Sequence, residues 1–193
     1  MAKGFCMSIA VLLLSACSFK PMSVNVQPVL LTSPMPSTAT GQPVWLSVSD
    51  GRDSPELGSR SISGKTAAIT AQNDLLKSLR QAFVKAYAAQ GFSFVSEKVE
   101  NVPELKLILL KTDYVSQSKA LQGTVTQLNT ELRLEARSAT KRYEKNYRSS
   151  VENKSTFTPM QAAVEEMVNS ALSDVLQRAV NDKTVQALLL TNE

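Results

Sequence analysis

Two aspartates, Asp50 and Asp53, lie at the end of a predicted strand beside Gly51, a common place for catalytic side chains. Such a carboxylate pair could divide the work of general acid and general base. The same residues with Arg52 also fit an Asx turn and a surface ion pair, and we favour the turn. The chain has no histidine and two cysteines, which excludes His-based triads and most metal hydrolases. We therefore expect no catalytic residue, no metal site and no cofactor.

The second cysteine, Cys17, offers a different chemistry because it follows a short apolar run. Residues 7–16 carry no charge and come shortly after the lysine at position 3. A basic start, a short apolar stretch and small residues at its end are typical of a secretory signal peptide. As a helix the run would span about 15 Å, half the hydrocarbon core, so it is too short for a transmembrane anchor.

The residues before Cys17, Leu14-Ser15-Ala16, resemble the lipobox of bacterial lipoproteins. That resemblance implies cleavage between Ala16 and Cys17, a diacylglyceryl group on the sulfur and an acyl chain such as palmitate on the new amine. Two or three acyl chains anchor a protein stably in a membrane, whereas a single chain does not. The residue after the cysteine is Ser18 and not aspartate, which within this class implies sorting to the outer membrane, on its periplasmic face.

A third group of candidate residues is basic and lies on a predicted hairpin. Arg142, Lys145 and Arg148 alternate with Tyr143 and Tyr147 and could contact an anionic surface such as lipopolysaccharide phosphate or a wall polymer. The alternative is a solvated strand face with both tyrosines turned to the core, and we favour it. The net charge of +4 is too small to argue for nucleic-acid binding.

The elements that would position these residues follow from the periodicity of the apolar side chains. Alternation predicts strands, and recurrence every three or four residues predicts helices. Residues 49–64 are rich in turn formers and are expected to form a loop. The predicted strands cover 44–48, 66–70, 92–95, 105–110, 124–136 and 143–151, the last two joined by a turn at 138–141, and the predicted helices cover 71–90 and 158–180.

Capping residues support both helices. Thr70 is the expected N-cap of the first helix, and Gly91 is expected in the left-handed conformation after its end. In the second helix, Thr158, Pro159 and Gln161 match a capping box with proline at the first helical position.

The order of the elements predicts the fold class. Three consecutive strands after one crossover helix favour an α+β fold with two layers, in which two main helices pack on one face of a mixed or antiparallel sheet of about four to five strands. Residues 1–16 are the expected signal peptide. Residues 17–43 are the expected lipidated, proline-rich tether, with an edge strand over Val24–Leu31, and residues 44–193 are the expected single domain.

Three short motifs, together with the lipobox, carry a resemblance to a known family. The sequences Asn73-Asp74-Leu75, Lys145–Ser150 and Val168–Asp174 are similar to the YajG family of proteobacterial outer-membrane lipoproteins. The family carries no established activity and no catalytic residues, so the resemblance implies a role only for the acylated Cys17.

Two functions from different classes remain after the enzyme hypothesis is discounted. The first is a lipid-anchored adaptor or envelope-assembly factor that binds a protein partner in the periplasm. The alternative is a binding module for an envelope polymer or glycolipid, peptidoglycan or lipopolysaccharide. An exposed apolar patch would favour the first function, and a basic concave groove would favour the second.

Overall fold

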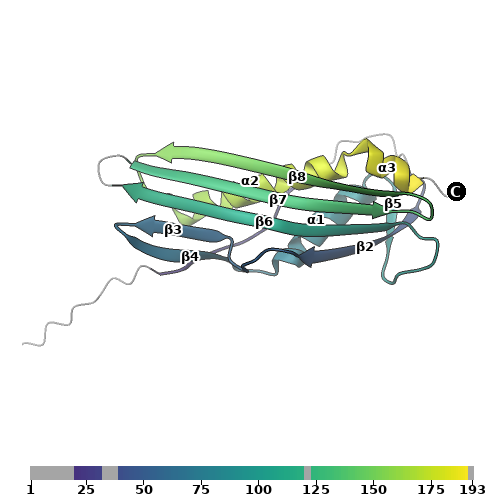
Figure 1. Cartoon of the computed structure of the whole chain (residues 1–193), viewed down its shortest axis with the longest axis horizontal. Helices are drawn as coiled ribbons and strands as arrows, with labels where there is room; N and C mark the ends of the chain where they lie inside the picture. Colours follow the sequence, from purple (N-terminus) through teal and green to yellow (C-terminus); the bar gives the residue numbers. More distant parts are fainter. Residues whose placement is uncertain (1–19, 32–38, 120–122, 191–193) are drawn as a thin grey trace, which may run out of the picture.

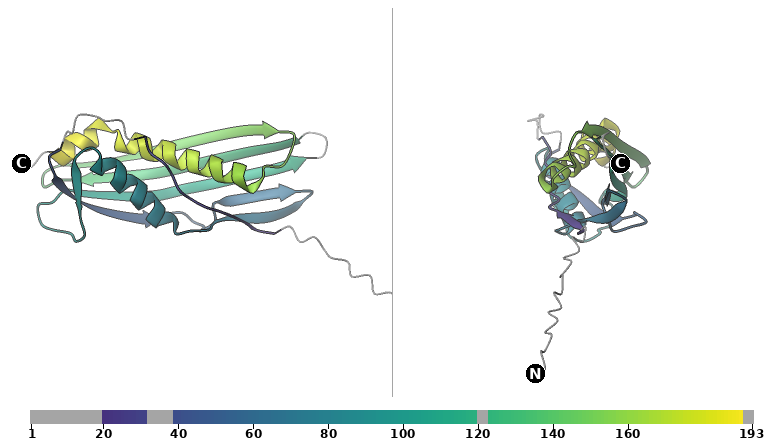
Figure 2. Two further views of the ribbon diagram at one scale, coloured as in Figure 1. Left: turned by 180° about the vertical axis from the view of Figure 1, so that it is seen from behind. Right: turned by 90° about the vertical axis from the view of Figure 1, so that its left-hand side faces the viewer.

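The protein folds into an elongated α+β structure in which the helices lie along the concave side of a strongly curled sheet (Figures 1 and 2). The structure is a computed structural model of the whole chain and describes residues 20–31, 39–119 and 123–190. Its mixed sheet has eight strands, so the expectation of four to five strands was wrong. The described helices are α1 (Leu75–Ala88), α2 (Gln161–Val180) and α3 (Lys183–Leu190).

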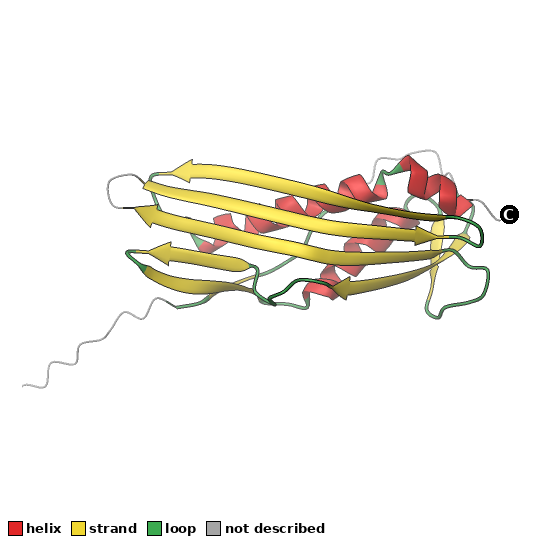
Figure 3. Cartoon of the chain, viewed as in Figure 1, coloured by secondary structure: helices red, strands yellow, loops and turns green. Residues whose placement is uncertain are grey.

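Three long antiparallel strands make up the largest part of the sheet (Figure 3). They are β6 (Glu104–Lys119), β7 (Gly123–Arg137) and β8 (Arg142–Ser155). The predicted hairpin is confirmed, with the turn at residues 138–141 where it was expected. The predicted strand 105–110 is only the first part of β6, because the polar residues that follow it continue the same strand.

The other edge of β6 is shared by two smaller groups of strands. Its first part pairs in parallel with β2 (Gln42–Asp50), which pairs in turn with β5 (Phe92–Val95). Its second part pairs with β3 (Gly58–Ile62), followed by β4 (Lys65–Ala71) and β1 (Met22–Val24).

Strand β3 lies inside the region expected to be a loop, so that expectation was wrong. Its pairing with β4 depends on a two-residue turn in which both Ser63 and Gly64 have positive φ. Gly58 is required at the start of β3, because a Cβ atom there would lie 2.0 Å from the backbone oxygen of Tyr114. The glycines that suggested a loop therefore permit a tight hairpin and a close strand contact.

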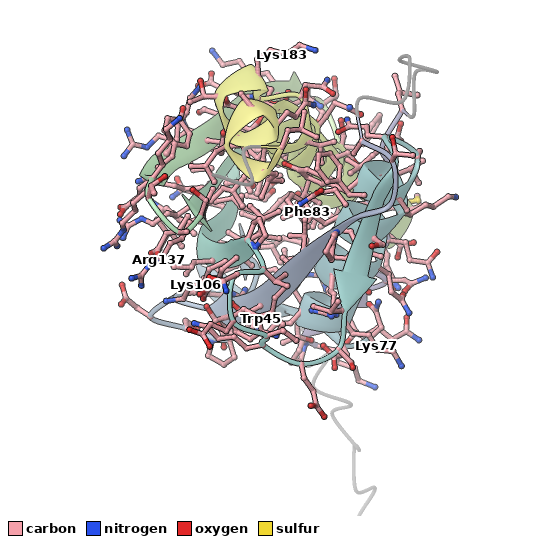
Figure 4. All side chains as sticks on the ribbon, turned by 90° about the vertical axis from the view of Figure 1, so that its right-hand side faces the viewer. Trp45, Lys77, Phe83, Lys106, Arg137 and Lys183 are labelled. Atoms are coloured by element: carbon pink, nitrogen blue, oxygen red, sulfur yellow. The ribbon has the colours of Figure 1, made fainter. Side chains whose placement is uncertain are left out.

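Much of the apolar core lies in the half of the molecule that holds α1 and α3, and the same cluster continues to Met22, Leu57 and Ile69. Leu105, Leu107 and Leu109 point inward from β6, and the rings of Phe83 and Tyr87 on α1 pack at a tilt of 42° with centroids 4.7 Å apart. Seen from this end of the molecule, Phe83 lies in the interior, while Lys77, Lys106, Arg137 and Lys183 lie at the periphery (Figure 4). Burial of these apolar side chains is the main stabilising contribution of this half.

The interior becomes polar toward the other end of the long strands. The register of β6 and β7 shifts between Leu109 and Lys111. Beyond that irregularity the buried residues of β6 and β7 are mostly hydroxyl-bearing, namely Thr112, Tyr114, Ser116, Thr124, Thr126 and Thr130. We call this end the Lys20 end, because Lys20 lies beside the β3–β4 hairpin, where its carbonyl accepts a hydrogen bond from Arg60.

Both main helices begin later than the sequence predicted. Helix α1 starts at Leu75 with Asp74 as its N-cap, because residues 65–71 belong to β4. Helix α2 starts at Gln161, and its N-cap Met160 makes no side-chain cap hydrogen bond, so the expected Thr158 capping box does not form. Helix α1 ends at Ala88, two residues before the predicted end, but Gly91 has φ +93° as expected and the ring of Phe92 packs against that of Tyr87.

Residues 20–31 are bound tightly along the helices. The edge strand is β1 (Met22–Val24) and does not extend to Leu31 as expected. Beyond it the chain runs extended along α2, and alternate backbone N–H groups donate to side chains of α2 at distances of 2.7–2.9 Å. The donors are Asn25, Gln27, Val29 and Leu31, and the acceptors, spaced four residues apart, are Glu165, Asn169, Ser173 and Gln177.

Asn73 holds the same segment from the side of α1. Its side-chain oxygen accepts from the N–H of Val26 and its amide nitrogen donates to the carbonyl of Val26, both at 2.8 Å. Val24 and Val26 are fully buried. The segment therefore contributes to the core both through Val24, which belongs to β1, and through Val26, which lies beyond that strand.

Candidate functional site

A groove of about 580 Å³ opens at the Lys20 end between α2 and β8. We call it the α2–β8 groove. Buried Tyr114 and Thr126 contribute to its lining from the sheet, and Val151 lines it from β8. Its lining from the helix side includes Ala163, Glu166, Met167 and Ser170, and Phe157, Thr158 and Pro159 lie in the loop that precedes α2.

The groove exists because the sequence of β8 changes along its length. In the first half of β8, Tyr143 and Tyr147 point inward, and Tyr147 is buried. In the second half the inward position is taken by Val151 and then Asn153, and both are exposed. Short and polar side chains there leave the space between strand and helix unfilled. Phe157, at 81% exposure, stands at this opening.

A second cleft, of about 590 Å³, lies where α2 ends and α3 begins. Lys145 and Arg148 line it from β8, Arg178 and Lys183 line it from the helices, and Asp182 lines it from the link between α2 and α3. We call it the Asp182 cleft. Lys145 Nζ lies 2.9 Å from Asp182, Arg148 2.9 Å from Glu131, and Arg178 2.7 Å from Asp174. These three cations are thus already paired with carboxylates of the same chain.

Asp182 organises this cleft from a nearly buried position, with 5% of its side chain exposed. Its Oδ2 accepts hydrogen bonds from Lys145 and from the hydroxyls of Tyr143 and Tyr147, and its Oδ1 accepts from the backbone of Thr184. Burial alone would raise the pKa of Asp182, but hydrogen bonds from Lys145, Tyr147 and Thr184 outweigh burial and lower the pKa to about 2. The hydrogen bond between Lys145 and Asp182 also raises the pKa of Lys145.

The structure brings together two of the three basic residues proposed from the sequence. Lys145 and Arg148 both line the Asp182 cleft, whereas Arg142 lies near the turn and lines a separate small pocket with Glu135. The orientation of the tyrosines follows the alternative that we favoured, because both hydroxyls contact Asp182 on the inner side of β8. Sequence reasoning missed Asp182, because its partners Tyr143, Lys145 and Tyr147 are more than thirty residues away in the chain.

Asp50 is paired with Arg52 in a tight turn. The guanidinium of Arg52 donates to both oxygens of Asp50, at 2.9 and 2.7 Å, and the backbone N–H of Arg52 closes the Asx turn onto the same carboxylate. The hydrogen bond from Arg52 keeps the pKa of Asp50 below its usual value. Arg52 also donates to the carbonyl of Glu56, so the turn interpretation is confirmed.

The residues expected to carry the lipid lie outside the described part of the chain. These are Ala16 and Cys17 at the expected cleavage site and Ser18 at the expected sorting position. Within residues 20–31, 39–119 and 123–190, no group of three or more acidic, cysteine or histidine side chains is placed to hold a metal ion. No helix of that same part is long and apolar enough to cross a membrane.

Comparison with known proteins gives a family match over most of the chain. Residues 31–189 match a family model described as "Uncharacterized lipoprotein". The chain is 22% identical over 184 residues to the uncharacterized lipoprotein YajG of Escherichia coli strains K12 and CFT073, covering 95% of this chain and 94% of the relative.

Two solved structures share the fold. The crystal structure of protein XCC0632 from Xanthomonas campestris superposes with a TM-score of 0.56 at 14% identity, covering 86% of this chain and 95% of that chain. An uncharacterized protein superposes with a TM-score of 0.50 at 8% identity, covering 84% and 98%. At these identities the likeness concerns the fold alone.

Proposed function

The chain belongs to the family of uncharacterized lipoproteins that includes YajG, and on that basis we propose that it is anchored in the outer membrane through acylated Cys17. The family membership agrees with the lipobox at residues 14–17, and Ser18 directs the lipoprotein away from inner-membrane retention. The folded part then faces the periplasm. The acyl chains supply the anchoring energy, which a single chain could not.

The anchor holds the domain close to the membrane surface. Only Ser18 and Phe19 separate Cys17 from Lys20, and three residues of extended chain span about 10 Å. The segment from Lys20 onward is held by β4, α1 and α2, so it does not lengthen the link between Cys17 and the domain. The Lys20 end, with the α2–β8 groove, is therefore the end nearest the bilayer.

We infer that the protein acts without catalysis, as an adaptor or envelope-assembly factor that binds a protein partner in the α2–β8 groove. One observation carries this inference: the groove is open and combines an exposed aromatic side chain, Phe157, with apolar lining from Val151 and Met167. Exposed aromatic and methionine side chains around a concavity are typical anchors of protein interfaces.

A second function is favoured by the Asp182 cleft. Lys145, Arg148 and Arg178 could bind the phosphates of lipopolysaccharide or the carboxylates of a wall polymer. An anionic ligand would have to compete with Glu131, Asp174 and Asp182, which already hold these cations. That competition makes the cleft the weaker of the two sites.

Site-specific photo-crosslinking in living cells tests the adaptor function. A p-benzoylphenylalanine in place of Phe157 should give one discrete protein adduct, and the same group in place of Lys141, at the far end of β8, should give none. Ser170→Arg fills the groove from an exposed helix position and should abolish the adduct, whereas Ala162→Arg, exposed on α2 outside the groove, should not. An adduct with lipopolysaccharide from position 183, and none from 157, would favour the second function.

A further inference from the structure

The strand that borders the groove has a free edge. Among the described residues β8 pairs only with β7, although it is 14 residues long. An unpaired strand edge presents backbone N–H and C=O groups that another extended chain can pair with. Long free edges are usually covered or interrupted in folded proteins, so this one calls for a reason.

The direction of the free backbone groups follows from one contact. The carbonyl of Arg148 accepts a hydrogen bond from the guanidinium of Arg178, so it points away from β7. Backbone groups in an antiparallel strand point alternately to either side. The N–H and C=O groups of Ser150, Glu152 and Lys154 therefore also point to the free edge, and all three residues are exposed. Within the described chain no backbone partner is found for these groups.

The groove lies on the inner side of this free stretch. Val151 and Asn153 alternate with the edge residues and face into the groove, and α2 forms its other wall through Met167 and Ser170. A strand added to the edge would place every second side chain over Val151 and Met167. Its backbone would meanwhile complete the hydrogen bonds of Ser150, Glu152 and Lys154. Edge and groove thus suit an extended peptide in the manner of β-strand addition.

The same helix already holds an extended segment on another side. Residues 25–31 lie along α2 through the side chains of Glu165, Asn169, Ser173 and Gln177. The groove is lined by different helix residues, at positions 163, 166, 167 and 170. Helix α2 is therefore built to pack against extended chain on one side, and its groove side offers a second such place that is empty of described residues.

We propose that the α2–β8 groove binds an extended segment of a partner protein as an additional strand on the edge of β8. This rests on the adaptor function proposed above and specifies how the partner is held. The segment alternates apolar and polar residues, with the apolar ones directed at Val151 and Met167. On its outer face a basic residue lies opposite Glu152 and an acidic residue opposite Lys154, because opposite charges on paired strands stabilise each other.

A second copy of this chain fits the edge less well. Antiparallel pairing of two copies over the free stretch, residues 150–154, would be symmetric about Glu152 and place the two Glu152 carboxylates opposite each other. Like charges directly opposite are destabilising. Moving the symmetry point toward Arg148 would require the carbonyl that Arg178 already occupies. The charges therefore favour a heterologous partner.

A proline at the edge tests the proposal in the full-length lipoprotein in cells. Glu152→Pro removes only an N–H that faces the free edge, a position where folded proteins tolerate proline, and Glu152→Ala removes the same side chain but keeps that N–H. With the photo-crosslinker at position 157, we expect the adduct yield to fall about tenfold in Glu152→Pro and only about twofold in Glu152→Ala, which loses the side-chain charge pair but keeps the backbone hydrogen bond. Thermal melts of both variants should match the wild type.

The outcomes separate this proposal from the adaptor function. An adduct that persists in a folded Glu152→Pro variant would overturn strand addition and leave the adaptor function standing. An adduct of twice the mass of the chain would replace the partner protein by a second copy and overturn the proposal. The absence of any adduct from position 157 in wild-type background would contradict the adaptor function itself, and strand addition with it.

Discussion

The two hydrogen bonds between the Asn73 side chain and the backbone of Val26 give the sharpest stability prediction. Asn73→Ala removes the acceptor of the Val26 N–H and the donor to the Val26 carbonyl. Val26 is fully buried, so water can replace these partners only if the segment moves. A buried backbone group left without its partner costs about 1–3 kcal/mol. We expect the variant to lose about 2–3 kcal/mol of unfolding free energy.

Two further variants grade the effect. Asn73→Asp keeps the acceptor for the Val26 N–H but sets a carboxylate oxygen against the Val26 carbonyl, so at neutral pH it should cost at least as much as Asn73→Ala. Lys77→Ala, exposed on the first turn of the same helix, should change stability by less than about 0.5 kcal/mol. Urea unfolding of residues 18–193, followed by circular dichroism, measures all three. An Asn73→Ala variant as stable as Lys77→Ala would refute the conclusion that residues 20–31 belong to the folded core.

Three other predictions concern the core, the Asp182 cleft and the anchor. Leu172→Ala on the buried face of α2 should cost about 2–5 kcal/mol in the same urea assay, and a loss below about 1 kcal/mol would contradict the packing described. The pKa of Asp182 is about 2 in the folded protein, against the ordinary 3.8. Its ionised carboxylate therefore contributes about 2 kcal/mol to the free energy of unfolding. This contribution is fully present above about pH 4 and is lost as the pH falls toward 2. Asp182→Asn should therefore flatten the fall in stability over that interval, and an unchanged slope would argue against the cluster. Radiolabelled palmitate should enter the wild type but not Cys17→Ser, and label in that variant would contradict the proposed lipid anchor. Ser18→Asp should shift the protein from the outer-membrane to the inner-membrane fraction of a density gradient, and no shift would contradict the proposed sorting.

The sequence predicted the elements whose periodicity is strong. The β7–β8 hairpin and its turn follow from strict alternation, and both main helices follow from their apolar stripes. The starts of the helices were placed too early, because the threonines at 70 and 158 are good N-caps by type but belong to a strand and to a loop. Capping signals are local, whereas strand pairing with distant residues decides which of them is used.

The parts that could not be predicted depend on contacts distant in sequence. Strand β3 is held by β6, more than fifty residues away, and its own residues, Gly58–Ile62, have little strand propensity. The groove arises where small or polar side chains on β8 and on α2 leave the space between strand and helix unfilled, and no local sequence pattern reveals this. One signal was available in the sequence: Glu165, Asn169, Ser173 and Gln177 repeat every four residues and line one side of a helix with acceptors.

The motifs that resemble the YajG family now have structural roles. Asn73 holds Val26, and Asp74 caps α1. Asn169 and Ser173, in the third motif, accept from the extended segment, and Lys145, in the second, pairs with Asp182. The contacts of Asn73, Asn169 and Ser173 hold residues 26–29 against the domain. These five residues of the three motifs therefore have structural roles, and none of them lines the α2–β8 groove.

Hydrogen–deuterium exchange across residues 149–157 tests the central claim, an anchored adaptor with an occupied groove, most directly. The outward N–H groups of Ser150, Glu152 and Lys154 have no partner in the described chain, so they should exchange rapidly in the purified lipoprotein. In outer-membrane vesicles that retain the native partner, we predict slowed exchange at these amides and unchanged exchange over residues 138–141. Equal exchange of residues 149–157 in both preparations would contradict the claim.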